Sequence, residues 1–324
     1  MRVLSGIQSS GKLHLGNWLG AMKQHVEGQD SHESFIFIAN LHALTSIQDA
    51  KLLQSLTVDV ALDYLALGLD PTKACLFRQS DVPEVTELSW ILATVTGKGL
   101  LERATSYKDK VAKGITPNMG LFTYPILMAA DILIYRSDLV PVGKDQLQHV
   151  EFAQDMATYF NEAYGTQVLK RPEAKLNEAL IVPGIDGQKM SKSYGNAISL
   201  FDPPAAVKKR IMSITTDSTP VEAPKDPDRC NVFALYRLLA RPDEVAALRA
   251  RYVAGGMGYG DAKKALVEVF ERMFEGPREL RASLASRPQA VEEILVESGR
   301  RARAVAVEVM REVRDACGLP PSPS

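Results

Sequence analysis

Two short segments of the sequence carry side chains that could bind the phosphates of a nucleotide. The first segment is SGIQSSGKLHLGN at residues 5–17, and the second is GQKMSKS at residues 187–193. Glycines allow a backbone to approach a phosphate closely, while histidine, asparagine and lysine side chains donate hydrogen bonds to its oxygens. Together the two segments predict a nucleotide site whose parts come from distant positions in the sequence.

The first segment admits two interpretations. Residues 6–12 have the G-x-x-x-x-G-K spacing of a phosphate-binding P-loop, but that motif continues with Ser or Thr to bind magnesium, and Leu13 cannot do so. Alternatively, His14, Gly16 and Asn17 begin a helix, where backbone N–H groups and the helix dipole favour an anion. Gly16 would then let an adenine ring approach the backbone. This four-residue pattern by itself is equally compatible with an ordinary strand-to-helix turn.

The second segment carries two lysines, Lys189 and Lys192, in a glycine-flanked loop after the apolar Leu180–Val182 run. Lysines in a mobile loop can close over a triphosphate and neutralise the charge that develops on a leaving pyrophosphate. A solvated basic loop is the ordinary alternative for two lysines three residues apart. The complete KMSKS string, found together with the first segment, favours nucleotide binding.

Apolar runs and amphipathic stretches alternate through the first two hundred residues. Buried strands are expected at the short apolar runs Arg2–Ile7, Phe35–Ala39, Ala74–Phe77 and Leu139–Val142. The spacing of apolar residues predicts helices at Leu15–Val26, Lys51–Leu67, Val85–Val95 and Phe122–Tyr135. This alternation is typical of an α/β fold with a helix-covered parallel sheet, and such sheets bind ligands beyond the carboxyl ends of their strands.

The pattern changes after Asp202. Two prolines break the chain, strand-like runs disappear, and helical stretches follow one another to the end. A loop rich in Pro, Asp and Ser is expected at 216–229, and a last helix from residue 288 to about 317. The sequence therefore predicts an α/β domain at 1–202 and an α-helical domain at 203–324.

Composition narrows the class of protein. The 324 residues include 46% hydrophobic and 24% charged residues, which is typical of a globular chain. The formal net charge of -1 means that a polyanion would have to meet a local basic face. Three widely separated cysteines argue against a thiolate metal site or a disulfide framework. No signal-peptide pattern or membrane-spanning apolar run is found, so we expect a cytoplasmic protein with no membrane partner.

The two segments resemble the HIGH and KMSKS signatures of class I aminoacyl-tRNA synthetases. Within that class, GIQSSGKLHLGN, TYPILMAADILIY, PVGKDQLQHVEF and QKMSKS resemble segments of the bacterial tryptophanyl-tRNA synthetase family, and the resemblance covers nearly all of the chain. It implies a Rossmann-type catalytic domain, an α-helical domain that binds the tRNA anticodon, and a homodimer. The implied activity uses ATP and Mg²⁺ to convert L-tryptophan to tryptophanyl-adenylate and then transfers tryptophan to tRNA(Trp), releasing AMP.

The resemblance also implies which residues act on the nucleotide. The residues implied in catalysis, by positioning and charge stabilisation without a side-chain nucleophile, are His14, Asn17, Lys189, Lys192 and Lys110. The residues implied to bind ATP are Gln8, Ser9, Ser10, Gly16, Asn17, Gly143, Lys144, Asp145, Ile181, Lys189, Met190, Ser191, Lys192 and Ser193. Ile181 would offer an apolar surface to adenine, and Asp145 would contact the ribose or the phosphates. For Lys110, a solvated surface charge is an equal alternative, and no residue is expected to bind a metal directly.

The choice of amino acid depends on the last helix expected in the first domain. Tyr124, Met128 and Asp131 are spaced four and three residues apart there and so share one face. An ionised Asp131 is costly in this apolar run unless it meets a donor, and an indole ring has one N–H donor and no acceptor. The residues implied to bind tryptophan are Asp131, Tyr124, Gln146, Met128 and His42. Tyr124 and Gln146 would hold the substrate ammonium, whereas a structural carboxylate, a core methionine and a packed histidine are the ordinary alternatives.

Three other functions stay open from the sequence. A tyrosyl-tRNA synthetase shares the fold and both motifs, and Tyr124 and Asp131 alone do not distinguish it. A catalytically idle relative is disfavoured by the intact motifs, and a P-loop NTPase is disfavoured by Leu13. Candidate tRNA contacts, for which solvated charged faces are the alternative, are Lys208, Lys209 and Arg210 and the last-helix residues Arg300, Arg301, Arg303, Arg311 and Arg314.

Overall fold

The computed structural model describes residues 1–8, 11–104, 118–176 and 181–321. Within these residues, five parallel strands form one sheet in the order β3-β2-β1-β4-β5. Their bounds are β1 Arg2–Ile7, β2 Glu33–Ile38, β3 Ala74–Arg78, β4 Leu139–Val142 and β5 Glu173–Leu176. The four strands expected from apolar runs are confirmed. Strand β5 has no such signal, because its EAKL sequence is polar and mostly exposed at the edge of the sheet.

Both faces of the sheet are buried, each in its own core cluster. Successive side chains of a strand point to opposite faces, so neighbouring residues enter different clusters. In β2, Ile36 and Ile38 belong to one core cluster, whereas Phe35 and Phe37 belong to the other. The helix α4 (Ala50–Ala66) packs into the first cluster. The second cluster includes residues of α5 (Glu84–Val95), α8 (Met119–Ile134) and α9 (Leu147–Ala163). The expected α/β fold with a helix-covered parallel sheet is confirmed.

The expected helices are present with small differences at their ends. Helix α8 begins earlier than the apolar pattern predicts, because the Asn118 side chain caps it and accepts from the Leu121 N–H at 2.8 Å. The helix expected at 15–26 is divided into α1 (Leu15–Asn17), a π-helical turn at Trp18–Met22 and α2 (Lys23–Gly28). The remaining short elements of this half are α3 Asn40–Ala43, η2 Gln79–Asp81, α6 Lys98–Glu102, η3 Lys144–Gln146 and η4 Lys192–Tyr194.

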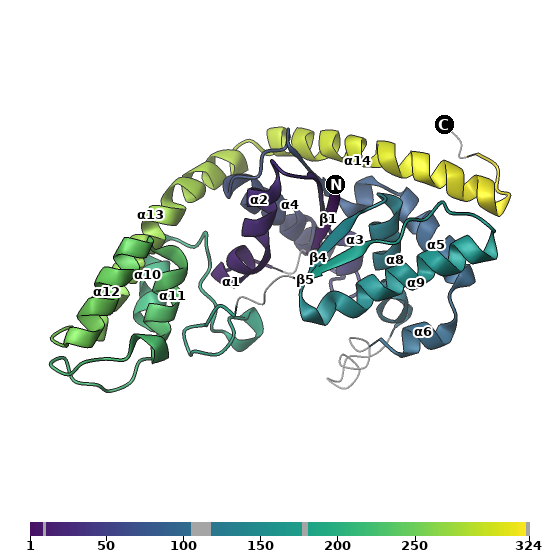
Figure 1. The fold of residues 1–324 in the computed structure, drawn as a ribbon. Coiled ribbons are helices and arrows are strands. Elements are labelled where there is room, and N and C mark those ends of the chain that lie inside the picture. Colours follow the sequence, from purple (N-terminus) through teal and green to yellow (C-terminus); the bar gives the residue numbers. More distant parts are fainter. Residues whose placement is uncertain (9–10, 105–117, 177–180, 322–324) are drawn as a thin grey trace.

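From residue 203 onward, the described chain forms helices and loops. The helices are α10 Pro204–Met212, α11 Asn231–Leu239, α12 Pro242–Ala254, α13 Tyr259–Ala285 and α14 Pro288–Cys317, with a 3-10 turn η5 at Pro227–Arg229. The expected loop is found, because residues 213–226 form neither helix nor strand. In Figure 1, α10, α11 and α12 gather at one end of the molecule, and α13 leads back to the sheet.

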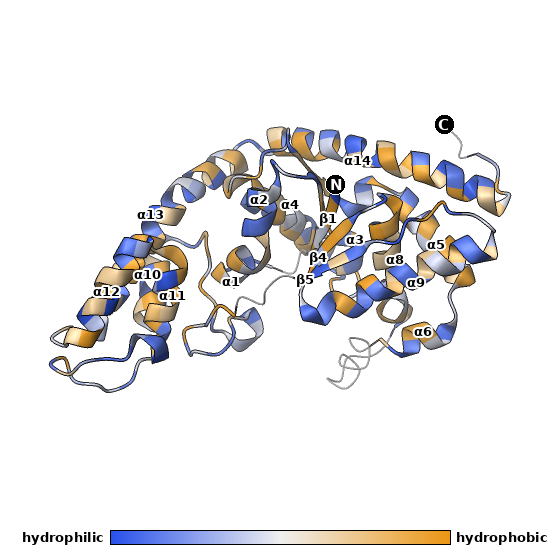
Figure 2. Cartoon of the chain, in the orientation of Figure 1, coloured by the Kyte–Doolittle hydropathy of each residue, from blue (hydrophilic) through white to orange (hydrophobic). Residues whose placement is uncertain are grey.

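The last helix lies along the first half of the chain instead of with α10–α12. Ala302, Ala306 and Val309 of α14 are buried in the second core cluster, together with residues of β3, α5 and α8. Figure 1 shows α14 running across the sheet half to the C-terminus, and Figure 2 shows apolar and polar residues alternating along it. This alternation is what a helix with one buried face requires. The division into domains at 202 and 203 stays a prediction.

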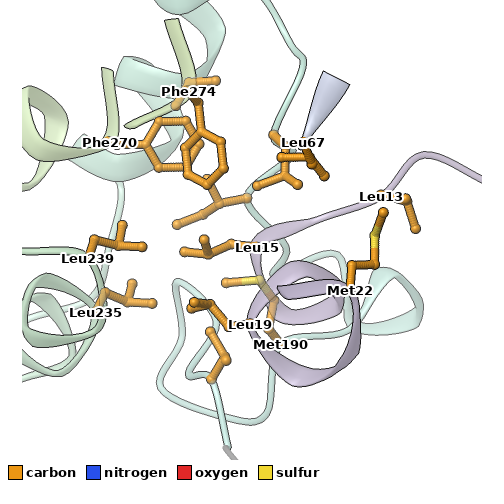
Figure 3. Packing of buried hydrophobic residues seen from close by; sticks show 14 of the residues in the cluster. Leu13, Leu15, Leu19, Met22, Leu67, Met190, Leu235, Leu239, Phe270 and Phe274 are labelled. Carbon is orange, nitrogen blue, oxygen red and sulfur yellow. The ribbon is translucent and has the colours of Figure 1, made fainter. Parts of the chain in front are cut away.

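One apolar core joins both predicted nucleotide segments to the helical half. Leu15 lies within the first segment, Met190 lies within the second, and both belong to the first cluster together with Leu235 of α11 and Phe270 of α13. Figure 3 shows these side chains packed around one another. A fully buried side chain of this size contributes about 1.5–3 kcal/mol. No helix among the described residues is long and apolar enough to span a membrane.

Candidate active site

The two predicted phosphate-binding segments lie side by side in the folded chain. The Leu15 N–H donates to the Ile198 carbonyl at 2.9 Å. His14 and Ser199 are paired next to this bond as an isolated antiparallel bridge. The structure therefore brings the beginning of α1 against the segment that follows the two lysines, as the shared nucleotide site requires.

His14 contributes a neutral ring to this junction. The residue is 7% exposed, and its buried Nδ1 makes no hydrogen bond within the described residues. Burial, and then the nearby positive charge of Lys192, lower the pKa of His14 from 6.5 to about 4. At neutral pH the ring can therefore donate one hydrogen bond to a phosphate oxygen, but it carries no positive charge.

Gly16 and Asn17 shape the turn around the His14 ring. The Asn17 Oδ1 accepts from the His14 N–H at 3.0 Å, which leaves the NH₂ end of this amide as the donor that could meet a phosphate. A Cβ atom at Gly16 would lie 3.0 Å from His14 Nδ1 and 3.4 Å from Met190 Cβ. The glycine therefore makes room for the histidine ring, and its contact with adenine stays a prediction.

The geometry of Lys12 and Leu13 contradicts the P-loop interpretation. Lys12 Nζ forms an ion pair with Asp202 Oδ1 at 3.0 Å, on the surface. Leu13 is buried in the first core cluster. A P-loop requires the lysine on the phosphates and a hydroxyl group at the next position. Neither requirement is met.

The lysine loop is organised by Asn196, which no motif singles out. Asn196 is 1% exposed. Its Oδ1 accepts from the Ser191 N–H at 2.7 Å, and its Nδ2 lies 2.8 Å from Asp186 Oδ1 and 3.2 Å from the Lys189 carbonyl. A buried amide bonded at both ends fixes the backbone on both sides of the loop. Its position three residues after the KMSKS string is the only hint in the sequence.

Within this loop, Met190 points inward and the lysines point outward. Met190 is buried, whereas Lys189 and Lys192 are exposed. The Lys192 Nζ lies 3.4 Å from the position that a Cβ atom of Gly11 would occupy. Partial burial lowers the pKa of Lys192, and the charge of Asp63 raises it. The Lys192 ammonium therefore lies over the turn between β1 and α1, where the sequence predicts phosphates.

An ion pair between α4 and α13 lies near this ammonium. Arg281 Nε is 2.5 Å from Asp63 Oδ1, and Arg281 Nη2 is 2.6 Å from Asp59 Oδ1. The guanidinium also lies over the Phe201 ring, 5.2 Å from its centre. Burial raises the pKa of Asp63 to about 6, even though Arg281 lowers it. This cluster joins the helical half to the helix α4 that covers the sheet.

The carboxyl ends of four strands bring other predicted residues together with Gln79, which was not predicted from the sequence. Gln8 follows β1, His42 lies in α3 after β2, Gln79 follows β3, and the Gly143–Gln146 turn follows β4. The strand order reverses between β1 and β4, which is where ligands bind in open parallel sheets. The side chains predicted from different parts of the sequence therefore meet at one edge of the sheet.

Asp131 is the most deeply buried acidic group at this edge. It is 1% exposed on α8, and its Oδ2 lies 2.9 Å from His42 Nε2. Gln79 Nε2 lies 2.9 Å from both carboxylate oxygens. Burial raises the pKa of Asp131, while His42 and Gln79 lower it. The carboxylate is thus held by an imidazole and an amide and not by an arginine. Gln79 was not predicted, because its partner lies far away in the sequence.

The other residues predicted to bind tryptophan lie around this group. The Tyr124 ring lies edge-on to His42, and its hydroxyl group is 2.7 Å from His149 Nε2. Gln146 Nε2 donates to Asp145 Oδ2 at 3.0 Å, and Met128 packs half-buried against the second core cluster. A pocket of about 440 Å³ between α3, α5 and α8 is lined by Tyr124, although Asp131 does not line it. Their roles toward a substrate stay predictions.

The remaining nucleotide predictions are distributed between the strand ends and the lysine loop. Gln8, Lys144 and Asp145 are exposed beyond β1 and β4, and Ile181 is 67% exposed ahead of the loop. Ser191 and Ser193 flank Lys192. Ser9, Ser10 and Lys110 lie outside the described residues, as does Leu180.

The proposed tRNA contacts need correction at several arginines. Arg210 donates to the carbonyls of Gly195 and Ala197 and so supports the lysine loop. On α14, the arginines that bond to the sheet half are Arg301 to the Pro71 carbonyl, Arg303 to Glu84 and Arg314 to Glu87. Arg300 pairs on the surface with Glu297. Arg301, Arg303 and Arg314 therefore hold the last helix in place. Lys208 and Lys209 on α10 are exposed.

No group of three or more His, Cys, Asp or Glu side chains that could hold a metal ion occurs in the part of the chain that the structure describes. The junction itself offers a neutral histidine, an amide and two ammonium groups. Magnesium prefers several oxygen ligands and is commonly bound through substrate phosphates. These residues are therefore suited to bind phosphates that carry a magnesium ion, and they do not themselves offer the oxygen ligands that would hold the ion.

Comparison with known proteins agrees with this site. Residues 1–275 match the family described as tRNA synthetases class I (W and Y). The chain therefore belongs to this family of class I tRNA synthetases. Among its relatives, a tryptophan–tRNA ligase of Rhodopirellula baltica is 52% identical over 320 residues, which cover 98% of this chain and 100% of the relative. One from Fusobacterium nucleatum is 51% identical and covers 98% of both chains.

Solved structures give the same result. The tryptophanyl-tRNA synthetase of Campylobacter jejuni, complexed with ADP and tryptophan, superimposes with a TM-score of 0.95 at 48% identity, over 98% of this chain and 100% of that one. The tyrosyl-tRNA synthetase of Archaeoglobus fulgidus reaches a TM-score of 0.65 at 22% identity, over 86% of this chain and 90% of that one. The second comparison shows the fold alone.

Proposed function

We propose that this chain is a tryptophan–tRNA ligase. The observation that carries the proposal is the buried Asp131 carboxylate, which is held by residues that follow β2 and β3, while the junction of His14 with the lysine loop follows β1 of the same sheet. A tryptophan carboxylate oxygen attacks the α-phosphorus of ATP and pyrophosphate leaves, which gives tryptophanyl-adenylate. A hydroxyl group of the terminal ribose of tRNA(Trp) then attacks the tryptophanyl carbonyl, and AMP leaves.

The first step needs positioning and charge stabilisation more than a side-chain nucleophile. Lys189 and Lys192 neutralise the negative charge that grows on the leaving pyrophosphate. His14 and Asn17 donate hydrogen bonds to phosphate oxygens, with His14 acting as a neutral donor. Lys110 is proposed for the same role from its sequence alone. Mg²⁺ that arrives on the substrate phosphates would supply additional positive charge.

Tryptophan is proposed to bind with its ring N–H on Asp131. A site built around such a hydrogen bond rejects an analogue without the donor by about 10⁴–10⁵. Tyr124 and Gln146 would hold the ammonium group, and Met128 would flank the ring. His42 supports the carboxylate at 2.9 Å and would form one wall of the tryptophan site. Phenylalanine cannot bond with Asp131, which gives this residue its selective effect.

The tyrosyl enzyme is the nearest alternative, because it shares the fold. ATP–pyrophosphate exchange with the purified chain separates the two, with each amino acid supplied alone. We expect exchange with tryptophan and loss of that exchange in Asp131→Asn, whose amide can present a donor where the indole needs an acceptor. Exchange stimulated by tyrosine alone would overturn the assignment.

The partner proposals rest on surface features. We propose that Lys208 and Lys209, both exposed, contact tRNA phosphates. We propose a homodimer in which the exposed apolar side chains Leu44, Trp90 and Met119 are covered by a second copy. Light scattering should give twice the mass of one chain, and Trp90→Glu should shift it toward the single chain. A cytoplasmic location is proposed because tRNA is charged there.

A further inference from the structure

Gln79 connects three elements next to the proposed amino-acid site. It begins η2 directly after β3 and is almost fully buried. Its Nε2 lies 2.9 Å from both oxygens of Asp131 on α8. Its Oε1 accepts from the backbone N–H groups of Leu41 at 3.0 Å and His42 at 3.3 Å, both in α3. Because both ends of the amide are bonded, the side chain cannot turn without losing contacts to α3 or α8.

The pattern of donors decides which part of the Asp131 carboxylate can accept another hydrogen bond. A carboxylate has about four lone-pair positions, two on each oxygen. Within the described residues, Oδ2 accepts from His42 and Gln79, whereas Oδ1 accepts from Gln79 alone. One acceptor position is therefore left on Oδ1, and an indole ring has one N–H donor to fill it.

We propose that Gln79 is a positioning residue for tryptophan selection. By donating to both oxygens of Asp131, it fixes the carboxylate so that Oδ1 presents its remaining lone pair to the ring N–H of the substrate. The inference rests on the proposed function, which assigns Asp131 to the indole. Gln79 does not touch the substrate and acts only through Asp131. Without this amide, His42 alone would hold the carboxylate, on one oxygen.

The first test compares two amino acids in the Gln79→Met variant of the full-length protein. One is tryptophan, and the other is 3-benzothienyl-alanine, in which sulfur replaces the ring N–H. We expect kcat/KM for tryptophan in ATP–pyrophosphate exchange to fall about 10- to 100-fold, as expected for one hydrogen bond to a charged group. The inhibition constant of the sulfur analogue should change less than threefold, and so should the KM for ATP.

A matched control measures the cost of exchanging a glutamine for methionine elsewhere. Gln154 on α9 donates to the Pro172 carbonyl at 2.8 Å and takes no part in the site. Gln154→Met should leave all three constants within twofold of the original chain. If Gln79→Met weakens tryptophan and the sulfur analogue equally, Gln79 only maintains the shape of the pocket and the proposal is wrong. An unchanged kcat/KM for tryptophan in Gln79→Met would also contradict the proposal.

A second variant keeps the test valid where Gln79→Met does not fold. Gln79→Glu retains an oxygen acceptor for the backbone of α3 but removes the NH₂ donor to Asp131. Assayed at pH 8.5, where two adjoining carboxyl groups share fewer protons, it should show the same selective loss toward tryptophan. Wild-type kcat/KM in this variant would overturn the proposal. Failure of the proposed function is seen separately, because the unsubstituted chain would then show no tryptophan-dependent exchange.

Discussion

Arg281→Gln should destabilise the folded chain much more at pH 8 than at pH 5. Arg281 supplies the positive charge next to Asp63, which is buried on α4. Burial already raises the pKa of Asp63 from 3.8 to about 6, so stability falls as the pH rises through this range and the folded carboxyl ionises. Removing Arg281 raises this pKa further. The additional loss therefore develops above pH 6, where Asp63 would otherwise be ionised.

The size of the loss in unfolding free energy follows from the burial of the Arg281–Asp63 ion pair. Removing one partner of a buried ion pair costs about 3–5 kcal/mol, and the lower end applies because the Arg281 side chain is 23% exposed. We therefore expect Arg281→Gln to lower the free energy of unfolding by about 3 kcal/mol at pH 8. At pH 5, Asp63 is mostly protonated in both chains, and only the half-buried Asp59 contact and the Phe201 stacking are lost. This loss is about 1 kcal/mol.

Thermal unfolding followed by circular dichroism at both pH values measures the difference. At roughly 2–4 °C for each kcal/mol in a chain of this order of size, Tm should fall several degrees further at pH 8 than at pH 5. The matched control is Arg300→Gln, because Arg300 pairs with Glu297 at the exposed surface. It should change Tm little at either pH. An equal decrease for Arg281→Gln at both pH values would refute the assignment of a buried, pKa-shifted Asp63.

The other predictions concern the nucleotide site. Burial lowers the pKa of His14 to about 4, so this histidine should not change its charge near pH 6.5. The pH profile of the exchange rate around pH 6.5 should therefore have the same shape in the original chain and in His14→Asn; a decrease near pH 6.5 that is lost in His14→Asn would contradict this. Lys192→Ala should slow pyrophosphate release in pre-steady-state experiments by orders of magnitude, with tryptophan affinity nearly unchanged; an unaltered rate removes Lys192 from the mechanism. Asn196→Ala should lower kcat for exchange at least about tenfold, because a buried amide that fixes the lysine loop is lost. Substituting Lys208 and Lys209 should flatten the salt dependence of tRNA affinity, and an unchanged slope excludes them as phosphate contacts.

Much of the sheet and its nucleotide edge could be predicted from the sequence. Four strands are continuous apolar runs, because a parallel sheet that is covered on both faces requires them. The histidine and lysine segments are short, unusual strings whose side chains suit phosphates wherever they fold. Asp131 lies in an apolar run, and this position also predicts hydrogen-bond donors next to it, since a buried carboxylate without donors is costly. These features are local, so one stretch of sequence contains them completely.

The tertiary structure alone decided which residues complete the site. Gln79 and Asn196 are ordinary amides in sequence, and their importance comes from partners on other elements. Arg210 reads as a free basic residue, yet it bonds to the lysine loop. Strand β5 lacks an apolar run because an exposed edge strand needs none. Hydrogen bonds and ion pairs depend on distances of a few ångströms between atoms, and only the folded chain sets those distances.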